Sequence, residues 1–290
     1  MMSEKMLKNK PLVSIITPVF NGKEFLEESV KSVLNQTYKK VEHIIVDGGS
    51  TDGTLEILKK YASKYPGRIR FISEPDKGTG DAWNKGWKMA KGDIFGWLGS
   101  DDMFEPDAIS AVVAFFKLNP DAYFVFGNYN VIDDDGKVIR RPAIKDFDLN
   151  ETINDRCYVP THASFYRREV VDKVGLIDTS LRLHNDLDYW IRVGKVFKMY
   201  RVDNVFSNFR LHKNSSIWHK DRSLRRSLDD EWMRLMVSKK NGGNTFLLYK
   251  RYFIFSIISI LIFLLRPVLL PLFPKIRKGF FRMKGVPDRD

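Results

Sequence analysis

Carboxylates gather in the polar turns that follow the apolar runs of the first hundred residues. They are Asp47, Asp81, Asp101 and Asp102. Like charges repel when they are brought together, so such a group requires hydrogen-bond donors or a cation. Adjacent aspartates offer the hard oxygen ligands that Mg²⁺ and Mn²⁺ prefer, and these ions also bind diphosphates. The pattern predicts a metal-assisted site for a ligand that carries a diphosphate, although each residue taken singly is also a common turn or helix-cap residue.

A further carboxylate, Asp186, stands at the start of a helical pattern over 187–193. A carboxylate at this place is often a simple helix cap. A carboxylate held beside a hydroxyl also acts as a general base, which contributes ~10²–10⁴-fold to a reaction rate. The residues alone allow both interpretations.

Several other site classes lack their motifs. The sequence has no GxxxxGK[ST] loop and no G-x-G-x-x-G after its first apolar run, which argues against a P-loop NTPase and a dinucleotide-binding enzyme. Its one cysteine, Cys157, excludes an internal disulfide and a cysteine-based zinc site.

The elements that must position the carboxylates follow from the apolar pattern. Apolar runs alternate with helical spacing, which predicts a parallel sheet covered by helices on both faces. The expected strands are 12–19, 43–46, 69–73 and 93–98, and the expected helices are 26–34, 53–61 and 81–90. Ligands bind at the carboxyl ends of strands in such sheets, where all four turns would meet. After a helix over 105–118, strands 123–126 and 129–132 and a hairpin into 138–140 introduce a mixed order.

The net charge of +12 is unevenly distributed. Residues 1–190 carry a net charge of −3, whereas residues 191–290 carry +15. A basic segment of this kind indicates an anionic partner, either nucleic acid or a membrane surface. A nucleic-acid-binding protein would spread its basic residues over a globular face with aromatic residues between them.

The basic residues instead bracket an apolar segment over 252–273, which follows an expected helix over 220–240. Its fourteen residues before Arg266 carry no charge and reach ~21 Å as a helix, less than the ~30 Å hydrocarbon core. Positive charge on both flanks fits two ends on the cytoplasmic face. We expect a helix that lies in or re-enters an anionic membrane surface, with no nucleic-acid partner.

Several blocks of sequence resemble the inverting, nucleotide-sugar-dependent glycosyltransferases of family 2, and the resemblance covers residues 11–215. The blocks are Val13-Ser14-Ile15-Ile16-Thr17-Pro18-Val19-Phe20-Asn21, Ile45-Val46-Asp47-Gly48-Gly49-Ser50-Thr51-Asp52-Gly53-Thr54, Glu74-Pro75-Asp76-Lys77-Gly78 and Asp81-Ala82-Trp83-Asn84-Lys85-Gly86. The last two are similar to a subgroup associated with polysaccharide assembly. The resemblance implies the α/β GT-A fold, with a mostly parallel Rossmann-like sheet.

The resemblance also implies roles for individual residues. Thr17, Pro18 and Asp47 would contact the base and ribose of the donor, and Asp81, Asn84 and Ser100 would line its pocket. Asp101, Asp102 and His212 would hold Mg²⁺ or Mn²⁺ at the diphosphate, and Asp186 would be the base. The chain departs from the family at Gly48 and Gly99, where aspartate is common.

Together these features predict a GT-A catalytic domain over 1–215 and a basic helical segment over 216–290. The expected activity is metal-dependent, inverting transfer of a sugar from a nucleoside diphosphate sugar to a lipid-linked or polysaccharide acceptor at the cytoplasmic membrane face. A nucleotidyltransferase on a similar fold is the alternative enzyme class; it would need a basic phosphate-binding loop near the N-terminus and no base at Asp186.

Overall fold

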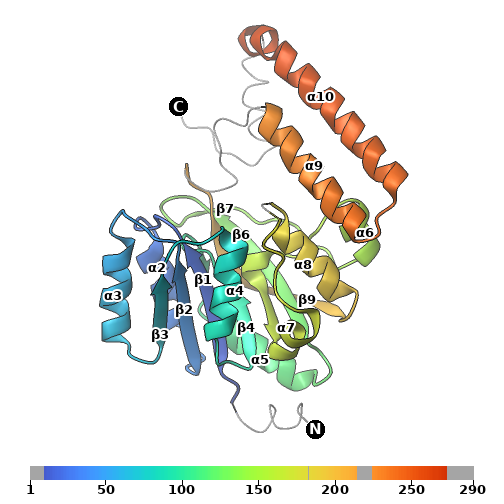
Figure 1. Ribbon diagram of the computed structural model, residues 1–290. Coiled ribbons are helices and arrows are strands. Elements are labelled where there is room, and N and C mark those ends of the chain that lie inside the picture. Colours follow the sequence, from blue (N-terminus) through green and yellow to red (C-terminus); the bar gives the residue numbers. More distant parts are fainter. Residues whose placement is uncertain (1–9, 182, 214–223, 273–290) are drawn as a thin grey trace.

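A nine-stranded sheet forms the centre of the molecule, with helices on both sides and a helical hairpin beyond it (Figure 1). The computed structural model describes residues 10–181, 183–213 and 224–272. The strand order is β3-β2-β1-β4-β8-β6-β9-β5, and β7 pairs with β6.

The first half of the sheet is parallel, as the alternating pattern predicts. Its strands are β3 (Ile69–Ser73), β2 (Val41–Asp47), β1 (Val13–Val19) and β4 (Ile94–Trp97). The central strands are almost entirely buried because helices cover both of their faces. Their carboxyl ends lie along one edge of the sheet, so the acidic turns meet there.

The second half is mixed, as the pattern after residue 118 predicts, so the sheet as a whole is not mostly parallel as the resemblance implies. It contains β5 (Met103–Phe104), β6 (Phe124–Ile132), β7 (Val138–Arg140), β8 (Ser164–Arg167) and β9 (Met199–Arg210). Strand β8 runs antiparallel to both β4 and β6, whereas β9 is parallel to β6 and antiparallel to β5. The strands expected over 123–126 and 129–132 are one continuous strand, β6. Its pairing with β9 shifts register around Gly127, where a Cβ would lie 2.6 Å from the carbonyl oxygen of Asn204.

Helices form a layer on each face of the sheet. In β1, Ile16 packs in one core with α4 (Thr79–Met89), α7 (Arg168–Val174) and α8 (Asn185–Gly194). The neighbouring Ile15 packs in another core with α5 (Ala108–Leu118). Successive side chains of a strand point to opposite faces, so these cores lie on opposite sides. Helices α2 (Leu26–Leu34) and α3 (Thr54–Lys64) share a core with Val19, on the α5 side.

The C-terminal part is a hairpin of two helices, α9 (Leu224–Lys240) and α10 (Thr245–Leu272), which lie side by side (Figure 1). The chain turns between them at Gly242, whose φ of 92° favours glycine. Val237 of α9 packs with Leu187 and Ile191 of α8. A neighbouring short helix, α6 (Leu149–Asn154), contributes Ile153 to this cluster.

The apolar segment 252–273 falls on α10, which is continuous to Leu272. Many large apolar side chains of α10 are exposed: Phe246, Leu247, Phe253, Ile254, Ile257, Ile258, Ile260 and Leu261. Within the ranges that the structure describes, no helix combines the length and hydropathy needed to cross a membrane.

Candidate active site

The turn after β2 is closed by the carboxylate of Asp47. This side chain is fully buried and accepts hydrogen bonds from the Ser50 amide at 3.1 Å and the Ser73 hydroxyl at 2.6 Å. The Ser50 hydroxyl also donates to it. The hydroxyl of Thr17, likewise buried, lies 2.8 Å from Nε2 of His43, while Pro18 is half-buried at the end of β1. Thr17 and Asp47 therefore shape the edge of the sheet from within, and their predicted contacts with a donor stay predictions.

The turns after β1 and β2 are joined to each other. The amide of Thr51 donates to Oδ1 of Asn21 at 2.9 Å, and the amide of Asn21 donates to the Ser50 hydroxyl at 2.7 Å. Asn21 has a φ of 50°, a conformation that asparagine tolerates better than most residues. These bonds hold both turns at one place before any ligand arrives.

A carboxylate from the next loop fills the space beside Gly48. A Cβ on Gly48 would lie 2.9 Å from Oδ2 of Asp76 and 3.4 Å from the ring of Phe20. Asp76 is held in place by the amide of Gly78, which donates to its Oδ1 at 2.7 Å. The site therefore has a carboxylate next to residue 48 although residue 48 itself has no side chain. Phe20 is 66% exposed at this edge and presents an aromatic surface there.

Asp101 and Asp102 converge at the turn after β4. A Cβ on Gly99 would lie 2.6 Å from Oδ2 of Asp102 and 2.7 Å from Oδ1 of Asp101, so both carboxylates approach one point. Burial, reinforced by the charge of Asp101, raises the pKa of Asp102 well above its ordinary value. The hydrogen bond from the Arg210 amide and the charge of Arg210 oppose this rise in pKa but do not cancel it, and a bound cation would favour the charged form of the pair further. Ser100 precedes the pair and approaches Gly22, where a Cβ would lie 3.2 Å from the Ser100 hydroxyl oxygen.

The chemistry of this pair fits Mg²⁺ or Mn²⁺, because Mg²⁺ commonly takes only one or two protein carboxylates together with substrate phosphates. Among the described residues, no three His, Cys, Asp or Glu side chains gather closely enough to hold a metal without such a substrate. His212 lies beside the pair, with its Nε2 3.0 Å from Oδ2 of Asp101. Its predicted role at the metal stays a prediction.

The same turn is fastened by Arg210, which we did not single out from the sequence. Arg210 is fully buried, and its guanidinium donates to the carbonyl of Asp101 at 3.0 Å and to the carboxylate of Glu28. Its amide donates to Oδ1 of Asp102 at 2.9 Å. One arginine at the end of a strand of mixed polarity is no signal by itself, because its partners lie in distant segments that meet it only when β9 pairs with β5.

A pocket of about 220 Å³ lies between the N-terminal turn of α4 and the residues that lead into α8. Both Asp81 and Asp186 line it, together with Trp83 and His184. The two helices approach closely at Gly80, where a Cβ would lie 2.6 Å from Nδ2 of Asn185. The pocket therefore joins the predicted donor side of the site to the predicted base.

Asp186 lies in the first turn of α8 and is not its N-cap, a position that His184 occupies. Its Oδ2 accepts a hydrogen bond from the Thr161 hydroxyl at 3.2 Å, and its Oδ1 accepts one from the Leu187 amide at 2.8 Å. A carboxylate is favourable at this end of a helix because of the helix dipole. Each carboxylate oxygen of Asp186 thus accepts one hydrogen bond from these groups, and the side chain is part-buried at the wall of the pocket.

Asn84 binds the backbone of a loop between α7 and α8. Its amide group exchanges two hydrogen bonds with the backbone of Ile177, at 2.9 and 3.0 Å, and it does not line the pocket. Asn84 therefore holds the loop 175–181 against α4. Its predicted donor contact is not tested by this geometry.

The tryptophans of the region belong to the core. Trp83 stacks on Trp97 with ring centres 4.2 Å apart, and the indole of Trp87 donates to the hydroxyl of Tyr166 at 3.0 Å. Only Trp83 among these also lines the pocket.

Two solved structures resemble this one in fold. Residues 1–349 of TarS from S. aureus, in complex with UDP-GlcNAc, give a TM-score of 0.61 at 17% identity over 78% of this chain and 66% of that one. The mannosyltransferase PcManGT from Pyrobaculum calidifontis, in complex with GDP-Man and Mn²⁺, gives 0.62 at 17% identity over 87% and 75%. These likenesses show the GT-A fold.

Sequence comparison gives relatives at higher identity. Chondroitin synthase of Escherichia coli is 31% identical over 212 residues, which cover 73% of this chain and 31% of that protein. The putative teichuronic acid biosynthesis glycosyltransferase TuaG of Bacillus subtilis is 32% identical over 214 residues, covering 71% and 81%. An uncharacterized glycosyltransferase of Rickettsia typhi is 31% identical, and the aligned part is 64% of its length.

In another uncharacterized glycosyltransferase, from Rickettsia bellii, the aligned part is 30% of the length, so this chain corresponds to a portion of such relatives. The model of the family described as glycosyl transferase family 2 matches residues 14–175, more than half of the chain. With the fold and the ordered motifs in agreement, the chain belongs to glycosyl transferase family 2.

Proposed function

We propose that this glycosyltransferase is metal-dependent and inverting, and that it transfers a sugar from a nucleoside diphosphate sugar to a hydroxyl of a glycan or lipid-linked acceptor. The observation that carries the proposal is that Asp81 and Asp186 line one pocket. A donor sugar held at Asp81 would then lie beside the carboxylate that receives the acceptor proton. The solved structures with UDP-GlcNAc and GDP-Man support a nucleotide-sugar donor.

In the proposed step, the acceptor oxygen forms a bond to the anomeric carbon while the bond from that carbon to the diphosphate oxygen breaks. The attack comes from the face opposite the leaving group, so the configuration inverts. Asp186 takes the proton of the attacking hydroxyl on one of its carboxylate oxygens. Thr161, which donates to Oδ2 of Asp186 at 3.2 Å, orients the carboxylate for this task.

Asp101 and Asp102 would hold the metal, which when bound would offset the negative charge of the departing diphosphate. Their convergence on one point at Gly99 supports this assignment. Arg210 would keep the two carboxylates in place by bonding to the Asp101 carbonyl and the Asp102 side chain.

The donor and the metal can be identified together. We expect one or a few nucleotide sugars from a UDP, GDP and dTDP panel to raise the melting temperature with Mn²⁺ or Mg²⁺ and to do so much less with EDTA. Asp102→Asn should abolish the metal-dependent part of the shift, while Asp172→Asn, an exposed control on α7, should retain it. A full shift in EDTA, or in Asp102→Asn, would exclude the metal role.

The exposed apolar side chains of α10 support a membrane-bound acceptor. A large unpaired apolar surface marks a contact with a protein or a membrane. Lys250 and Arg251 lie among these residues, and Arg266 and further basic residues follow in the sequence. Each basic residue near an anionic surface contributes about 1 kcal/mol. An anionic, cytoplasmic membrane face is therefore the surface that we propose for α10.

Flotation with vesicles tests this surface. We expect the full chain to float with phosphatidylglycerol vesicles and to bind phosphatidylcholine vesicles more weakly. Replacing Ile254 and Ile258 together by aspartate should abolish flotation, since both side chains are about half exposed. Leu118→Asp is a matched control, because Leu118 is 82% exposed on α5. Equal flotation of the α10 variant and the wild type would contradict the proposal.

A further inference from the structure

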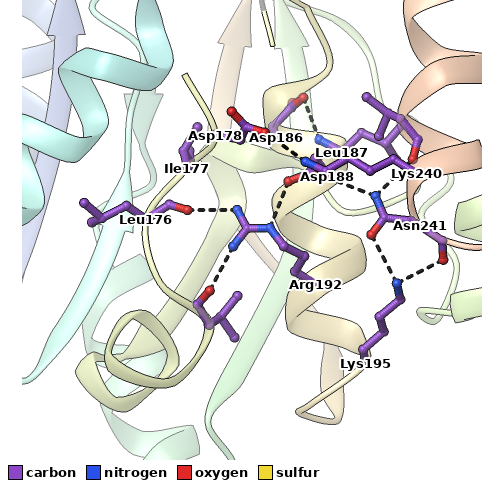
Figure 2. A network of polar contacts seen from close by, with 12 residues as sticks. Leu176, Ile177, Asp178, Asp186, Leu187, Asp188, Arg192, Lys195, Lys240 and Asn241 are labelled. Carbon is purple, nitrogen blue, oxygen red and sulfur yellow. Dashed lines mark hydrogen bonds and ion pairs between the residues drawn. The ribbon is translucent and has the colours of Figure 1, made fainter. Parts of the chain in front are cut away.

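Asp188, a carboxylate of α8, bonds to the residues at the C-terminal end of α9 (Figure 2). Asp188 is fully buried. Its Oδ1 lies 3.1 Å from both Nζ of Lys240 and Nδ2 of Asn241, and its Oδ2 lies 2.8 Å from Nε of Arg192. Lys195 completes the contact from the other side, donating to the carbonyl of Asn241 at 2.9 Å. The C-terminal hairpin is therefore bonded to the helix that carries Asp186.

The same groups also hold the loop 175–181. Lys240 forms an ion pair with Asp178 at 2.9 Å, and Arg192 donates to the carbonyls of Val174 and Leu176, each at 2.9 Å (Figure 2). Ile177, in the middle of the loop, is bonded to Asn84 of α4. Since Thr179 and Leu181 line the pocket, the network holds one wall of the pocket as well as α8.

A buried carboxylate is stable only while its partners remain, and removing one of them is costly. Asp188 follows Asp186 by two residues in the first turn of α8. We therefore expect that a displacement of the backbone at Asp188 also displaces the carboxylate of Asp186. A displacement of about 1 Å in a reacting group can cost about 10²-fold in rate. The turns after β1, β2 and β4, where the base, ribose and diphosphate of the donor would bind, make none of the contacts described for this network. We therefore expect most of the donor-binding energy to be independent of it, although the pocket beside Asp81 shares one wall with it.

We propose that Lys240 and Asn241 are positioning residues for glycosyl transfer: through Asp188 they fix the first turn of α8, and through Asp178 Lys240 fixes the pocket loop. The C-terminal hairpin thus positions catalytic elements and also carries the exposed apolar surface of α10. This inference rests on the proposed role of Asp186 and extends it to two residues that lie 54 and 55 positions further along the chain.

The test uses the full chain and measures nucleoside diphosphate release from the donor found in the panel. Lys240→Met should lower kcat at least tenfold and leave the KM for the donor within twofold of wild type. Lys240→Arg, which keeps the charge and donors, should recover most of kcat. Lys239→Met is the control: this exposed neighbour lies over the ring of Tyr249 at 5.7 Å, and its loss should leave kcat unchanged.

A double-mutant cycle separates positioning from general loosening. If Lys240 acts through Asp186, the variant with both Lys240→Met and Asp186→Asn should be no slower than Asp186→Asn alone. Additive losses, an unchanged kcat in Lys240→Met, or a donor KM that rises as far as kcat falls would each overturn the inference. A wild-type rate in Asp186→Asn would instead overturn the proposed function, so the two failures are distinguishable.

Discussion

At the scale of single residues, Gly48 and Asp76 show how a carboxylate can come from a different loop. The family commonly has aspartate at position 48, and here the Asp76 side chain occupies the space that a side chain of residue 48 would need. This relation between Asp76 and position 48 is visible only in the folded chain, because the two residues lie in loops after different strands.

This replacement gives a prediction for Gly48→Asp. The new carboxylate would meet that of Asp76, and two like charges at such a distance repel. We expect donor affinity to fall about tenfold, which corresponds to ~1.4 kcal/mol. Gly48→Asp combined with Asp76→Gly should restore most of it, as measured by titration calorimetry. A gain in affinity from Gly48→Asp alone would show that Asp76 does not occupy that space.

At the scale of elements, α8 joins the body of the molecule to the C-terminal hairpin at both of its ends. Lys195, just past the helix, bonds to Asn241, and His184, just before it, lies 3.3 Å from Oδ1 of Asp230 on α9. Burial opposes the charged form of His184, but the hydrogen bond and charge of Asp230 prevail and raise its pKa.

That shift predicts a pH dependence of stability. Because the folded pKa of His184 lies above the unfolded value of about 6.5, its stabilisation is fully present below that value and is lost as pH rises through the folded pKa. The melting temperature should therefore decline as the pH rises above about 6.5. In His184→Asn, which tolerates the φ of 57°, the decline should be smaller. An identical decline in both proteins would rule out this histidine as its source.

The elements also show what sequence reasoning can reach. The parallel half was predictable because its strands are continuous apolar runs that alternate with amphipathic helices, a local pattern. In the second half the sequence predicted strands and a mixed order but not how the strands pair, since Phe124 of β6 pairs with Met199 of β9 and nothing local specifies that pairing. The roles of Arg210 and Asp188 are hidden for the same reason: their partners come from distant segments. Only the Asp188–Arg192 pair, four residues apart on one helix, gave a local signal.

At the scale of the whole molecule, the net charge of +12 is the sum of −3 on residues 1–190 and +15 on residues 191–290. The acidic body brings carboxylates to one edge of the sheet. The basic C-terminal part is joined to that body through α8, and α10 exposes an apolar surface beyond it. Membership of family 2 removes the basis for the nucleotidyltransferase alternative.

The most direct test of the central claim is the turnover of Asp186→Asn with the donor found in the panel, with water or glycan as acceptor. The account predicts that nucleoside diphosphate release falls by about 10²-fold or more, because the base is lost. The donor should still raise the melting temperature as in the wild type, because the turns after β1, β2 and β4 are intact. Turnover at the wild-type rate would contradict the account and remove Asp186 from the reaction.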